Sequence, residues 1–224
     1  MDGDPEMTSM LLSRLHYPVS NLGFGTRAGV WFQGCTIGCR GCLARDTWPS
    51  DEATRCDVRR VLERLRHTPG PLDGVTISGG EPTDQPEALR ALLAGLERRH
   101  AETGAPLDVL LFSGRSAKWL RAKCAWVFDA VDVLVSEPFV AAKAGCEPLR
   151  GSSNQHVHVL TDLGRERYLG PDFTRYAAQR RQLGVHVDGG TVRLVGIPLP
   201  GHMAALTAAL SEQDIELDDA SWLS

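Results

Sequence analysis

Short apolar runs alternate along this chain with segments of helical periodicity, and this alternation limits the possible folds more than any other feature. The apolar runs that predict strands span residues 29–33, 74–77, 107–112, 131–135 and 156–160. Apolar residues at helical spacing predict amphipathic helices over residues 57–67, 85–100 and 117–127. Strands that alternate with helices indicate βαβ units, so we expect an α/β fold built on a parallel sheet.

The connections between these strands predict the shape of the sheet. Parallel strands require right-handed crossovers, which curl the sheet towards a full or partial (β/α) barrel. We expect functional groups at the carboxyl ends of the strands, where the βα loops gather. The pattern changes after residue 160, so we expect a core of residues 1–160 and an α+β C-terminal extension, residues 161–224, packed on it. Within the extension we expect helices over residues 173–183 and 202–210 and a strand over residues 192–197.

Composition excludes several classes of protein. The 224 residues carry a formal net charge of -4, which provides no basic surface for a nucleic-acid backbone. The longest apolar runs are too short to cross a bilayer, and residues 1–10 lack the apolar segment of a secretion signal. We therefore expect a cytoplasmic protein with no nucleic-acid or membrane partner.

Three of the six cysteines lie close together, at Cys35, Cys39 and Cys42. Without a secretion signal, such a group indicates metal or redox chemistry rather than disulfides. Thiolates are the usual ligands of iron–sulfur clusters, and three of them leave one iron of a four-iron cluster open for chemistry. The alternatives are a zinc site with a distant fourth ligand and buried thiols that lie together by chance.

The other three cysteines share no spacing with this group. Cys56, Cys124 and Cys146 are far apart in the sequence, and we expect them to be small buried hydrophobic residues. The sequence leaves open whether any of them has a redox role.

The cysteine spacing, together with Gly79-Gly80-Glu81-Pro82 after the second predicted strand, resembles the radical S-adenosylmethionine (SAM) superfamily. The closest resemblance is to the activating enzymes of anaerobic ribonucleotide reductase, which are glycyl radical enzyme activases. The matching stretches keep the family order over about residues 14–160. Besides the cysteine triplet and the Gly79-Gly80-Glu81-Pro82 motif, the matching stretches are Tyr17-Pro18-Val19, Gly23-Phe24-Gly25-Thr26-Arg27, Phe32-Gln33-Gly34-Cys35, Gly41-Cys42, Thr47-Trp48, Phe112-Ser113-Gly114, Asp132-Val133-Leu134-Val135 and Arg150-Gly151-Ser152-Ser153-Asn154-Gln155.

This resemblance implies a partial barrel of the radical SAM type and two cofactors. A 4Fe–4S cluster is expected on Cys35, Cys39 and Cys42, with the amino and carboxylate groups of SAM on the fourth iron. One electron, from a flavodoxin- or ferredoxin-type donor, then cleaves SAM to methionine and a 5′-deoxyadenosyl radical, which removes a hydrogen atom from the substrate. The cofactors supply the chemistry, and the protein supplies geometry and excludes water.

The resemblance also implies which residues bind SAM. They are Gly41, Gly79, Gly80, Glu81, Ser113 and Ser136. Gly79 and Gly80 lack side chains and so allow close approach of the methionyl group, while the Glu81 carboxylate suits its ammonium. For Glu81 the alternative is a cap on the next helix, and for Ser113 it is a plain turn serine. Family members usually have Asp-Gly where this chain has Ser136-Glu137.

Three further residues are candidates for contact with cofactor or substrate. Arg27 precedes the first predicted strand, and its alternative role is a structural ion pair. Asn154 lies in a polar loop that we expect over the barrel mouth. His158 shares a strand face with His156, and a hydrogen-bonded core histidine is its alternative.

Three functions are compatible with this pattern. The first is an activase that abstracts hydrogen from a glycine of a glycyl radical enzyme such as anaerobic ribonucleotide reductase. The second is a radical SAM enzyme that modifies a small metabolite or peptide, which the C-terminal extension, the Ser136-Glu137 departure and Phe24 between Gly23 and Gly25 favour. The third is a non-catalytic iron–sulfur carrier or sensor, against which the three-cysteine count and Gly79-Gly80-Glu81-Pro82 argue.

Overall fold

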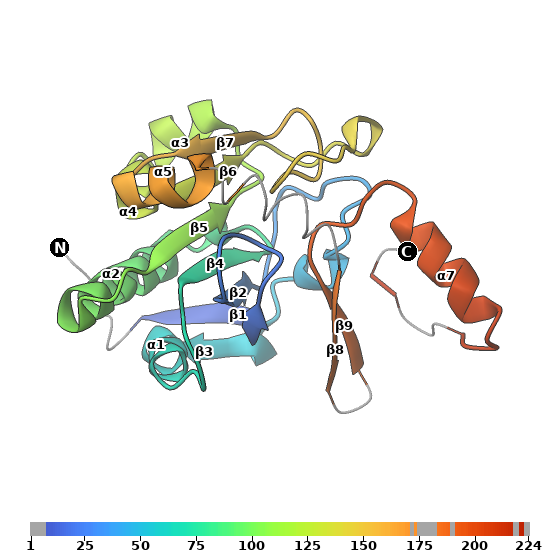
Figure 1. Cartoon of the computed structure of the whole chain (residues 1–224), viewed down its shortest axis with the longest axis horizontal. Coiled ribbons are helices and arrows are strands. Elements are labelled where there is room, and N and C mark those ends of the chain that lie inside the picture. The colour runs from blue at the N-terminus through green and yellow to red at the C-terminus, as the bar shows by residue number, and fades with distance from the viewer. Residues whose placement is uncertain (1–7, 171–172, 174–182, 189–190, 217–219, 222–224) are drawn as a thin grey trace.

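The computed structural model describes residues 8–170, 173, 183–188, 191–216 and 220–221. Its centre is a seven-stranded sheet in the order β3-β1-β2-β4-β5-β6-β7, and β8 and β9 form a separate hairpin (Figure 1). The strands are β1 (Ser9–Val19), β2 (Arg27–Phe32), β3 (Arg55–Asp57), β4 (Gly74–Gly79), β5 (Asp108–Phe112), β6 (Val133–Ser136), β7 (His156–Val159), β8 (Gly184–Asp188) and β9 (Thr191–Val195). The α-helices are α1 (Val58–Arg66), α2 (Pro86–Thr103), α3 (Ala117–Lys123), α4 (Val127–Ala130), α5 (Asp162–Leu169) and α7 (His202–Ser211).

The middle of the sheet is parallel and its edges are antiparallel. Strands β2, β4, β5 and β6 pair in parallel, whereas β1 and β3 at one edge and β7 at the other run antiparallel to their neighbours. The edge strands β3 and β7 do not pair with each other within the described ranges, so the sheet stays open. The α/β class with a parallel core is therefore confirmed, and the extension contributes a small β-hairpin.

Most predicted elements lie within a few residues of the observed ones, but β1 was not predicted. Its pairing with β2 shifts register twice, between Leu12 and Arg14 and between His16 and Val19. Such bulges interrupt the alternation of buried and exposed residues on which strand prediction depends. The structure also adds β3, β8 and α5. The helix expected over residues 173–183 lies almost wholly outside the described residues.

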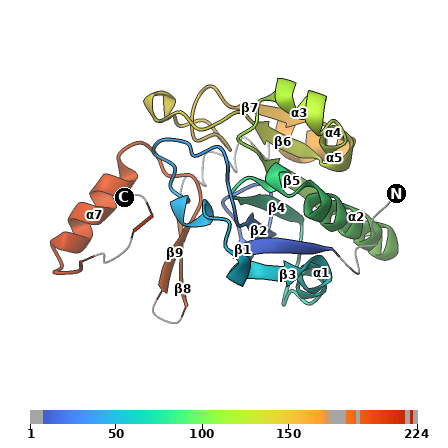
Figure 2. The ribbon, with the colours of Figure 1, turned by 180° about the vertical axis from the view of Figure 1, so that it is seen from behind.

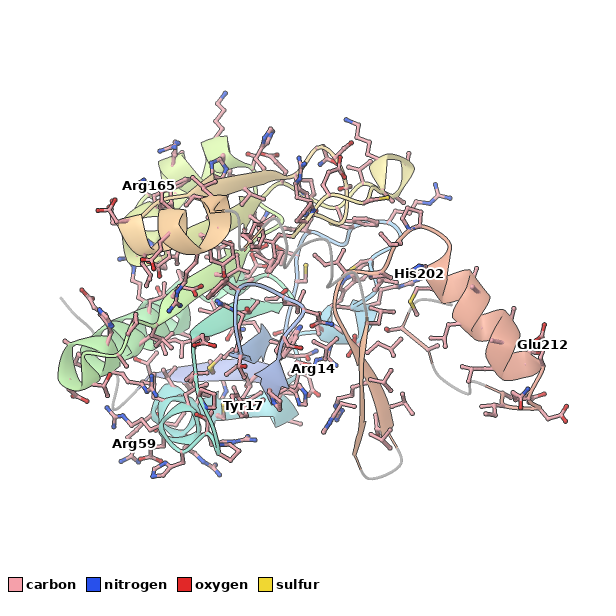
Figure 3. All side chains as sticks on the ribbon, viewed as in Figure 1. Arg14, Tyr17, Arg59, Arg165, His202 and Glu212 are labelled. Carbon is pink, nitrogen blue, oxygen red and sulfur yellow. The ribbon has the colours of Figure 1, made fainter. Side chains whose placement is uncertain are left out.

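The sheet has a helix face and an opposite face with different coverings. On the helix face, Leu134 of β6 joins the main core with residues of α1, α2 and α3. Figure 2 shows these elements from behind. On the opposite face, Val133 and Val135 pack with Leu149 and Tyr168. Successive strand residues point to opposite faces, so this division tells which side chains of each strand face the helices. Charged residues such as Arg59 of α1 and Arg165 of α5 lie at the surface (Figure 3).

The extension begins by packing α5 onto the amino-terminal ends of the parallel strands. Asp108 at the start of β5 binds Arg27 of β2 at 2.7 Å and Arg167 of α5 at 2.6 Å. The hydroxyl of Tyr168, also on α5, donates to the same carboxylate at 2.9 Å. All four side chains are buried, so this network fixes α5 to the core.

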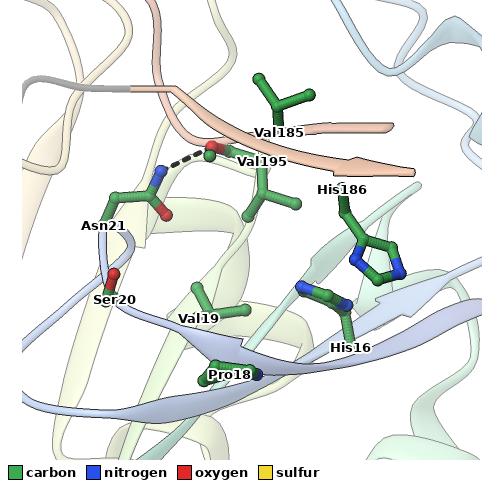
Figure 4. Close-up of a pocket in the computed structure, with 9 residues that line it drawn as sticks. His16, Pro18, Val19, Ser20, Asn21, Val185, His186 and Val195 are labelled. Atoms are coloured by element: carbon green, nitrogen blue, oxygen red, sulfur yellow. Dashed lines mark hydrogen bonds between the residues drawn. The ribbon is translucent and has the colours of Figure 1, made fainter. Parts of the chain in front are cut away.

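The β8–β9 hairpin packs against the end of β1. Val195 of β9 is buried with Val19 and Trp31, and the His16 and His186 rings lie 4.3 Å apart. Asn21 donates from its side-chain amide to the Val195 carbonyl at 2.5 Å, beside a cavity of about 100 Å³ (Figure 4). None of the described helices combines the length and apolar character that crossing a bilayer requires.

Candidate functional site

The loop after β2 carries the three grouped cysteines, and residues 33–44 are called the cysteine loop below. Its base is held by hydrogen bonds to the returning chain. Gly34 N–H donates to the Thr47 carbonyl at 2.8 Å and Cys35 N–H to the Trp48 carbonyl at 3.0 Å. The Gln33 side-chain amide donates to the carbonyls of Asp46 and Pro49. The loop is thus an ordered turn, helped by glycines with positive φ at positions 34, 38 and 41.

The end of β4 continues directly against this loop. Gly80 N–H donates to the Phe32 carbonyl and Glu81 N–H to the Gly34 carbonyl, both at 2.8 Å. A Cβ atom on Gly80 would lie 2.0 Å from the Gly34 carbonyl oxygen, and one on Gly79 would lie 2.4 Å from Phe32 backbone atoms. The two glycines are therefore required by close approach to β2 and the cysteine loop. The reason expected from the sequence was close approach of a ligand.

The Glu81 carboxylate lies in a full set of hydrogen bonds. Its Oε1 accepts from Thr83 N–H, from the Thr83 hydroxyl at 2.6 Å and from the Ser113 hydroxyl at 2.8 Å. Its Oε2 accepts from Gly114 N–H at 2.8 Å. The residue is only 1% exposed, so a ligand reaches this carboxylate only if a neighbouring donor gives way. The structure therefore shows the capping role that the sequence left open beside ammonium binding.

Burial also changes the protonation of this carboxylate. Desolvation is the largest cause and raises the pKa of Glu81 above its ordinary value, whereas the hydrogen bonds from Thr83, Ser113 and Gly114 lower it. Ser113 and Glu81 come together because both follow parallel strands at the same edge of the sheet, as the strand order predicts.

The three thiols of the cysteine loop are free and half-buried. Burial is the largest cause that raises the pKa of both Cys39 and Cys42, and the negative charge of Cys35 raises both further. Within the described part of the chain, no group of three His, Cys, Asp or Glu side chains is close enough to hold one metal ion. A four-iron cluster carries each thiolate on a different iron, so its ligands do not have to meet at one point.

The loop between β6 and β7 packs on the tip of the cysteine loop. A Cβ atom on Gly41 would lie 3.2 Å from the Ala141 side chain and 3.6 Å from the Phe139 ring. Asn154 belongs to this β6–β7 loop and donates from its side-chain amide to the Pro138 carbonyl at 2.9 Å. Its Oδ1 is buried and has no partner among the described residues. Gly41 and Asn154 are thus brought to one region.

The structure places Ser136, a predicted SAM-binding residue, in contact with His158. Its hydroxyl lies 3.0 Å from Nε2 of His158 and is fully buried. Ser136 shares the helix face of β6 with Leu134, whereas Val135 points to the opposite face. His158 packs edge-on against Phe128 of α4, and burial is the largest cause that lowers its pKa. Both residues therefore belong to the packing under the helices.

Arg27 is also placed away from the cysteine loop. It is fully buried at the amino-terminal end of β2, opposite to the carboxyl end where the loop begins. Its guanidinium pairs with Asp108 and donates from Nε to the Thr76 hydroxyl at 2.7 Å. The ion pair that the sequence analysis kept as an alternative is the arrangement observed.

Sequence reasoning missed the side chains that tie the three loops together. Asp84 and Arg115 each follow a matched motif and lie at the same edge of the sheet. Asp84 accepts two hydrogen bonds from Thr36, the residue after Cys35, and Arg115 donates to both. The available signal was a charged residue one or two positions after a strand-end motif, in each of two neighbouring loops.

Comparison with known proteins adds three findings to this geometry. Residues 21–158 match the family model described as a 4Fe-4S single cluster domain. The anaerobic ribonucleoside-triphosphate reductase-activating protein of Pasteurella multocida is 30% identical over 156 residues, which cover 65% of this chain and 96% of that protein. The pyruvate formate-lyase-activating enzyme of Streptococcus mutans is 34% identical over 152 residues, covering 64% of this chain and 57% of that protein.

A solved structure was also matched. The crystal structure of QueE from Escherichia coli superposes with a TM-score of 0.41 and 16% sequence identity, over 48% of this chain and 53% of that chain.

Proposed function

This chain belongs to the radical SAM family of glycyl radical enzyme activases, whose cofactors are a 4Fe–4S cluster and SAM, and from that premise we propose how its residues work. The proposed activity is activation of a glycyl radical enzyme, with anaerobic ribonucleotide reductase as the target. When bound and reduced, the cofactors supply one-electron cleavage of SAM and a 5′-deoxyadenosyl radical that takes hydrogen from a glycine. The chain's own residues supply the geometry that orients the cofactors and exclude water.

We propose that Cys35, Cys39 and Cys42 hold the cluster. The donor set fits: three half-buried free thiols lie on one ordered loop. In the cluster-free chain the charges of Cys42 and Cys35 add to burial in raising the pKa of Cys39, and the charge of Cys35 does the same for Cys42; the positive charge of bound iron would relieve that repulsion. Three ligands leave one iron for SAM, as the sequence spacing predicts.

The segment at the end of β4 is the proposed site for the methionyl part of SAM. Gly79 and Gly80 are half-buried, so their backbone is within reach of a ligand beside the cysteine loop. Glu81 and Ser113 are proposed to fix the shape of this segment through their shared hydrogen bond, with direct contact to the ammonium only after Glu81 exchanges a donor. Gly41 and Asn154 are proposed to contact the cofactor from the β6–β7 loop side, where Gly41 packs on Ala141 and Asn154 bonds to Pro138.

The observation that carries this proposal is the direct bonding of the end of β4 to the base of the cysteine loop, through Glu81 N–H and the Gly34 carbonyl. It brings the proposed cluster ligands and the proposed SAM segment side by side. The test is cleavage of SAM to 5′-deoxyadenosine by anaerobically reconstituted protein with dithionite. We expect cleavage by the wild type and none by Cys42→Ala, whereas Cys56→Ala, outside the loop, should remain active. Turnover by Cys42→Ala would exclude the assignment.

The target is tested separately. We expect a stable glycyl radical, seen by electron paramagnetic resonance (EPR), when the activated chain is mixed with anaerobic ribonucleotide reductase. If the reductase carries deuterium at its glycines, deuterium should appear in 5′-deoxyadenosine. A flavodoxin- or ferredoxin-type carrier is the proposed physiological donor. The cytoplasm is the proposed compartment, since its reducing conditions keep thiols free.

One observation favours a second candidate. The match to the family ends at residue 158, yet the extension continues and the Ser221 hydroxyl donates to the Leu43 carbonyl of the cysteine loop. An extension that contacts this loop can alter access to the site, so a small metabolite or peptide is the alternative substrate. SAM cleavage without any glycyl radical on the reductase, but with deuterium transfer from such a molecule, would favour it.

A further inference from the structure

Thr36, the residue directly after Cys35, is held by an ion pair from two other loops. Asp84 Oδ2 accepts from the Thr36 N–H and from the Thr36 hydroxyl, both at 2.8 Å. Arg115 Nη2 donates to Asp84 Oδ1 at 2.7 Å and to the Thr36 hydroxyl at 2.6 Å. The three residues form a closed triangle, called the Thr36 clamp below.

The clamp joins the three loops that carry the matched motifs. Asp84 lies three residues after Glu81, and Arg115 lies two residues after Ser113. The guanidinium of Arg115 also stacks on the Trp119 ring at 4.8 Å, which fixes it against α3. Exposed ion pairs contribute little, but these side chains are only 24% and 17% exposed and share a third partner. Charge-assisted hydrogen bonds of this kind are roughly twice as strong as neutral ones.

The clamp has a geometric and an electrostatic consequence for Cys35. Fixing the backbone N–H of Thr36 restricts the direction in which the preceding side chain leaves the loop. Arg115 also brings a positive charge towards Cys35 and Glu81. A reduced cluster carries one more negative charge than an oxidised one, so a nearby cation favours reduction.

We propose that Arg115 and Asp84 are positioning residues for the cluster: together they orient Cys35 through Thr36, and the charge of Arg115 favours the reduced state. This inference rests on the proposed function, because it takes Cys35 as a cluster ligand. It assigns a role to two residues outside the cysteine triplet and the proposed SAM segment.

The geometric part is tested on cluster-free full-length protein by amide hydrogen exchange at Thr36. Asp84→Ala removes the oxygen that accepts both Thr36 hydrogen bonds, so the Thr36 amide should exchange at least about tenfold faster than in the wild type. Arg115→Gln should accelerate exchange less. The matched control is Arg121→Gln, since Arg121 is also on α3 and stacks on an aromatic ring, Phe128, but does not reach the loop. Unchanged exchange in Asp84→Ala overturns the clamp.

The electrostatic part is tested on reconstituted protein by redox titration followed by EPR. Arg115→Gln should lower the ratio of reduced to oxidised cluster about tenfold at a fixed potential, which corresponds to about 59 mV for a one-electron couple. Arg115→Lys keeps the charge and should restore most of the shift. Asp84→Ala removes a negative charge and should not lower the potential. A merely structural role would move the potentials of Asp84→Ala and Arg115→Gln in the same direction.

The outcomes separate this inference from the function on which it rests. If the wild type takes up no four-iron cluster, the proposed function fails, while hydrogen exchange still decides whether the clamp exists. If the cluster forms and cleaves SAM but Arg115→Gln leaves its potential unchanged, the electrostatic role is overturned and the proposed function stands. Circular dichroism and thermal unfolding of each variant verify that it is folded.

Discussion

At the scale of single residues, the buried carboxylate of Glu81 gives the chain a defined pH dependence. Burial raises its pKa above the ordinary 4.5, despite the four hydrogen bonds that it accepts. The folded state therefore binds more protons than the unfolded state above pH 4.5, and this group lowers stability as the pH rises through that window. The contribution levels off once the pH exceeds the folded-state pKa.

Glu81→Gln removes this titration while it keeps the size of the side chain. The free energy of unfolding of the wild type, relative to Glu81→Gln, should fall as the pH is raised from 4.5. Urea unfolding of cluster-free protein at a series of pH values measures the difference. A difference that does not vary with pH would contradict the buried, hydrogen-bonded carboxylate described here.

Gly80 should tolerate no side chain, because of the approach of β4 to the cysteine loop. A Cβ atom there would stand 2.0 Å from a backbone oxygen, which cannot rotate away as a flexible side chain can. Overpacking of this kind costs about 1–3 kcal/mol, so Gly80→Ala should lower the free energy of unfolding by at least that much. Iron uptake on reconstitution should fall as well, since the base of the cysteine loop must move.

The matched control is Gly184→Ala, whose added Cβ meets its nearest atoms at an ordinary 3.5 Å. Chemical unfolding and iron analysis of both variants provide the comparison. Equal stability and equal iron content in the two variants would contradict the claim that the close approach of Gly80 to the Gly34 carbonyl excludes a side chain.

The residues of the site were partly predictable from the sequence. The meeting of Cys35, Gly80, Glu81 and Ser113 follows from the rule that parallel strands end at one edge of a sheet. The face to which Ser136 points was not predicted. Alternation along a four-residue strand divides its residues between two faces, but it does not show which of those faces the helices cover. Asp84 and Arg115 escaped notice because isolated charges after strands carry no motif of their own.

At the scale of elements, the first residue of the β6–β7 loop, Glu137, is strained. Glu137 has a φ of 82°, a region that favours glycine. Its Oε1 accepts from Ala117 N–H at 2.9 Å, so the side chain caps α3. The cap explains why a glutamate is tolerated at this position.

Two substitutions separate the strain from the cap. Glu137→Ala loses the cap and keeps the strain, whereas Glu137→Gly loses both. The glycine variant should therefore be more stable than the alanine variant by about 1–2 kcal/mol, the cost of a left-handed conformation for a residue with a Cβ atom. Thermal or chemical unfolding of the pair decides; equal stability would contradict the backbone conformation.

The attachment of α5 to the sheet depends on the buried charge of Asp108. The substitution Asp108→Asn removes this negative charge and leaves two buried arginines, Arg27 and Arg167, without a full counter-charge. Breaking a buried pair on one side costs about 3–5 kcal/mol, and we expect a loss of that size. The control is Asp162→Asn in the exposed pair with Arg165, where the loss should stay below about 1 kcal/mol. Similar losses in both variants would refute the anchoring role.

The sequence predicted the central elements more readily than the edges. Strands β2, β4, β5 and β6 are buried and coincide with the short apolar runs, so their type could be predicted directly. The edge strand β1 has bulges, and α5 has only a weak apolar stripe, since its buried residues include Arg167. Tertiary contacts, rather than local patterns, hold these elements in place.

At the scale of the whole molecule, the chain combines a family core with an extension that returns to the site. The extension is fixed at its start by the Asp108 network and touches the cysteine loop near its end, through Ser221 and Leu43. Between these contacts the β8–β9 hairpin packs on β1. The extension thus contacts the core near both ends of the parallel strands.

The central claim is that three thiolates of the cysteine loop hold a four-iron cluster whose remaining iron binds SAM. The most direct measurement is electron–nuclear double resonance on reconstituted, dithionite-reduced protein with SAM labelled by nitrogen-15 at its amino group. The account predicts hyperfine coupling between the label and the cluster. An intact four-iron cluster without such coupling, or metal analysis that finds zinc in its place, would contradict it.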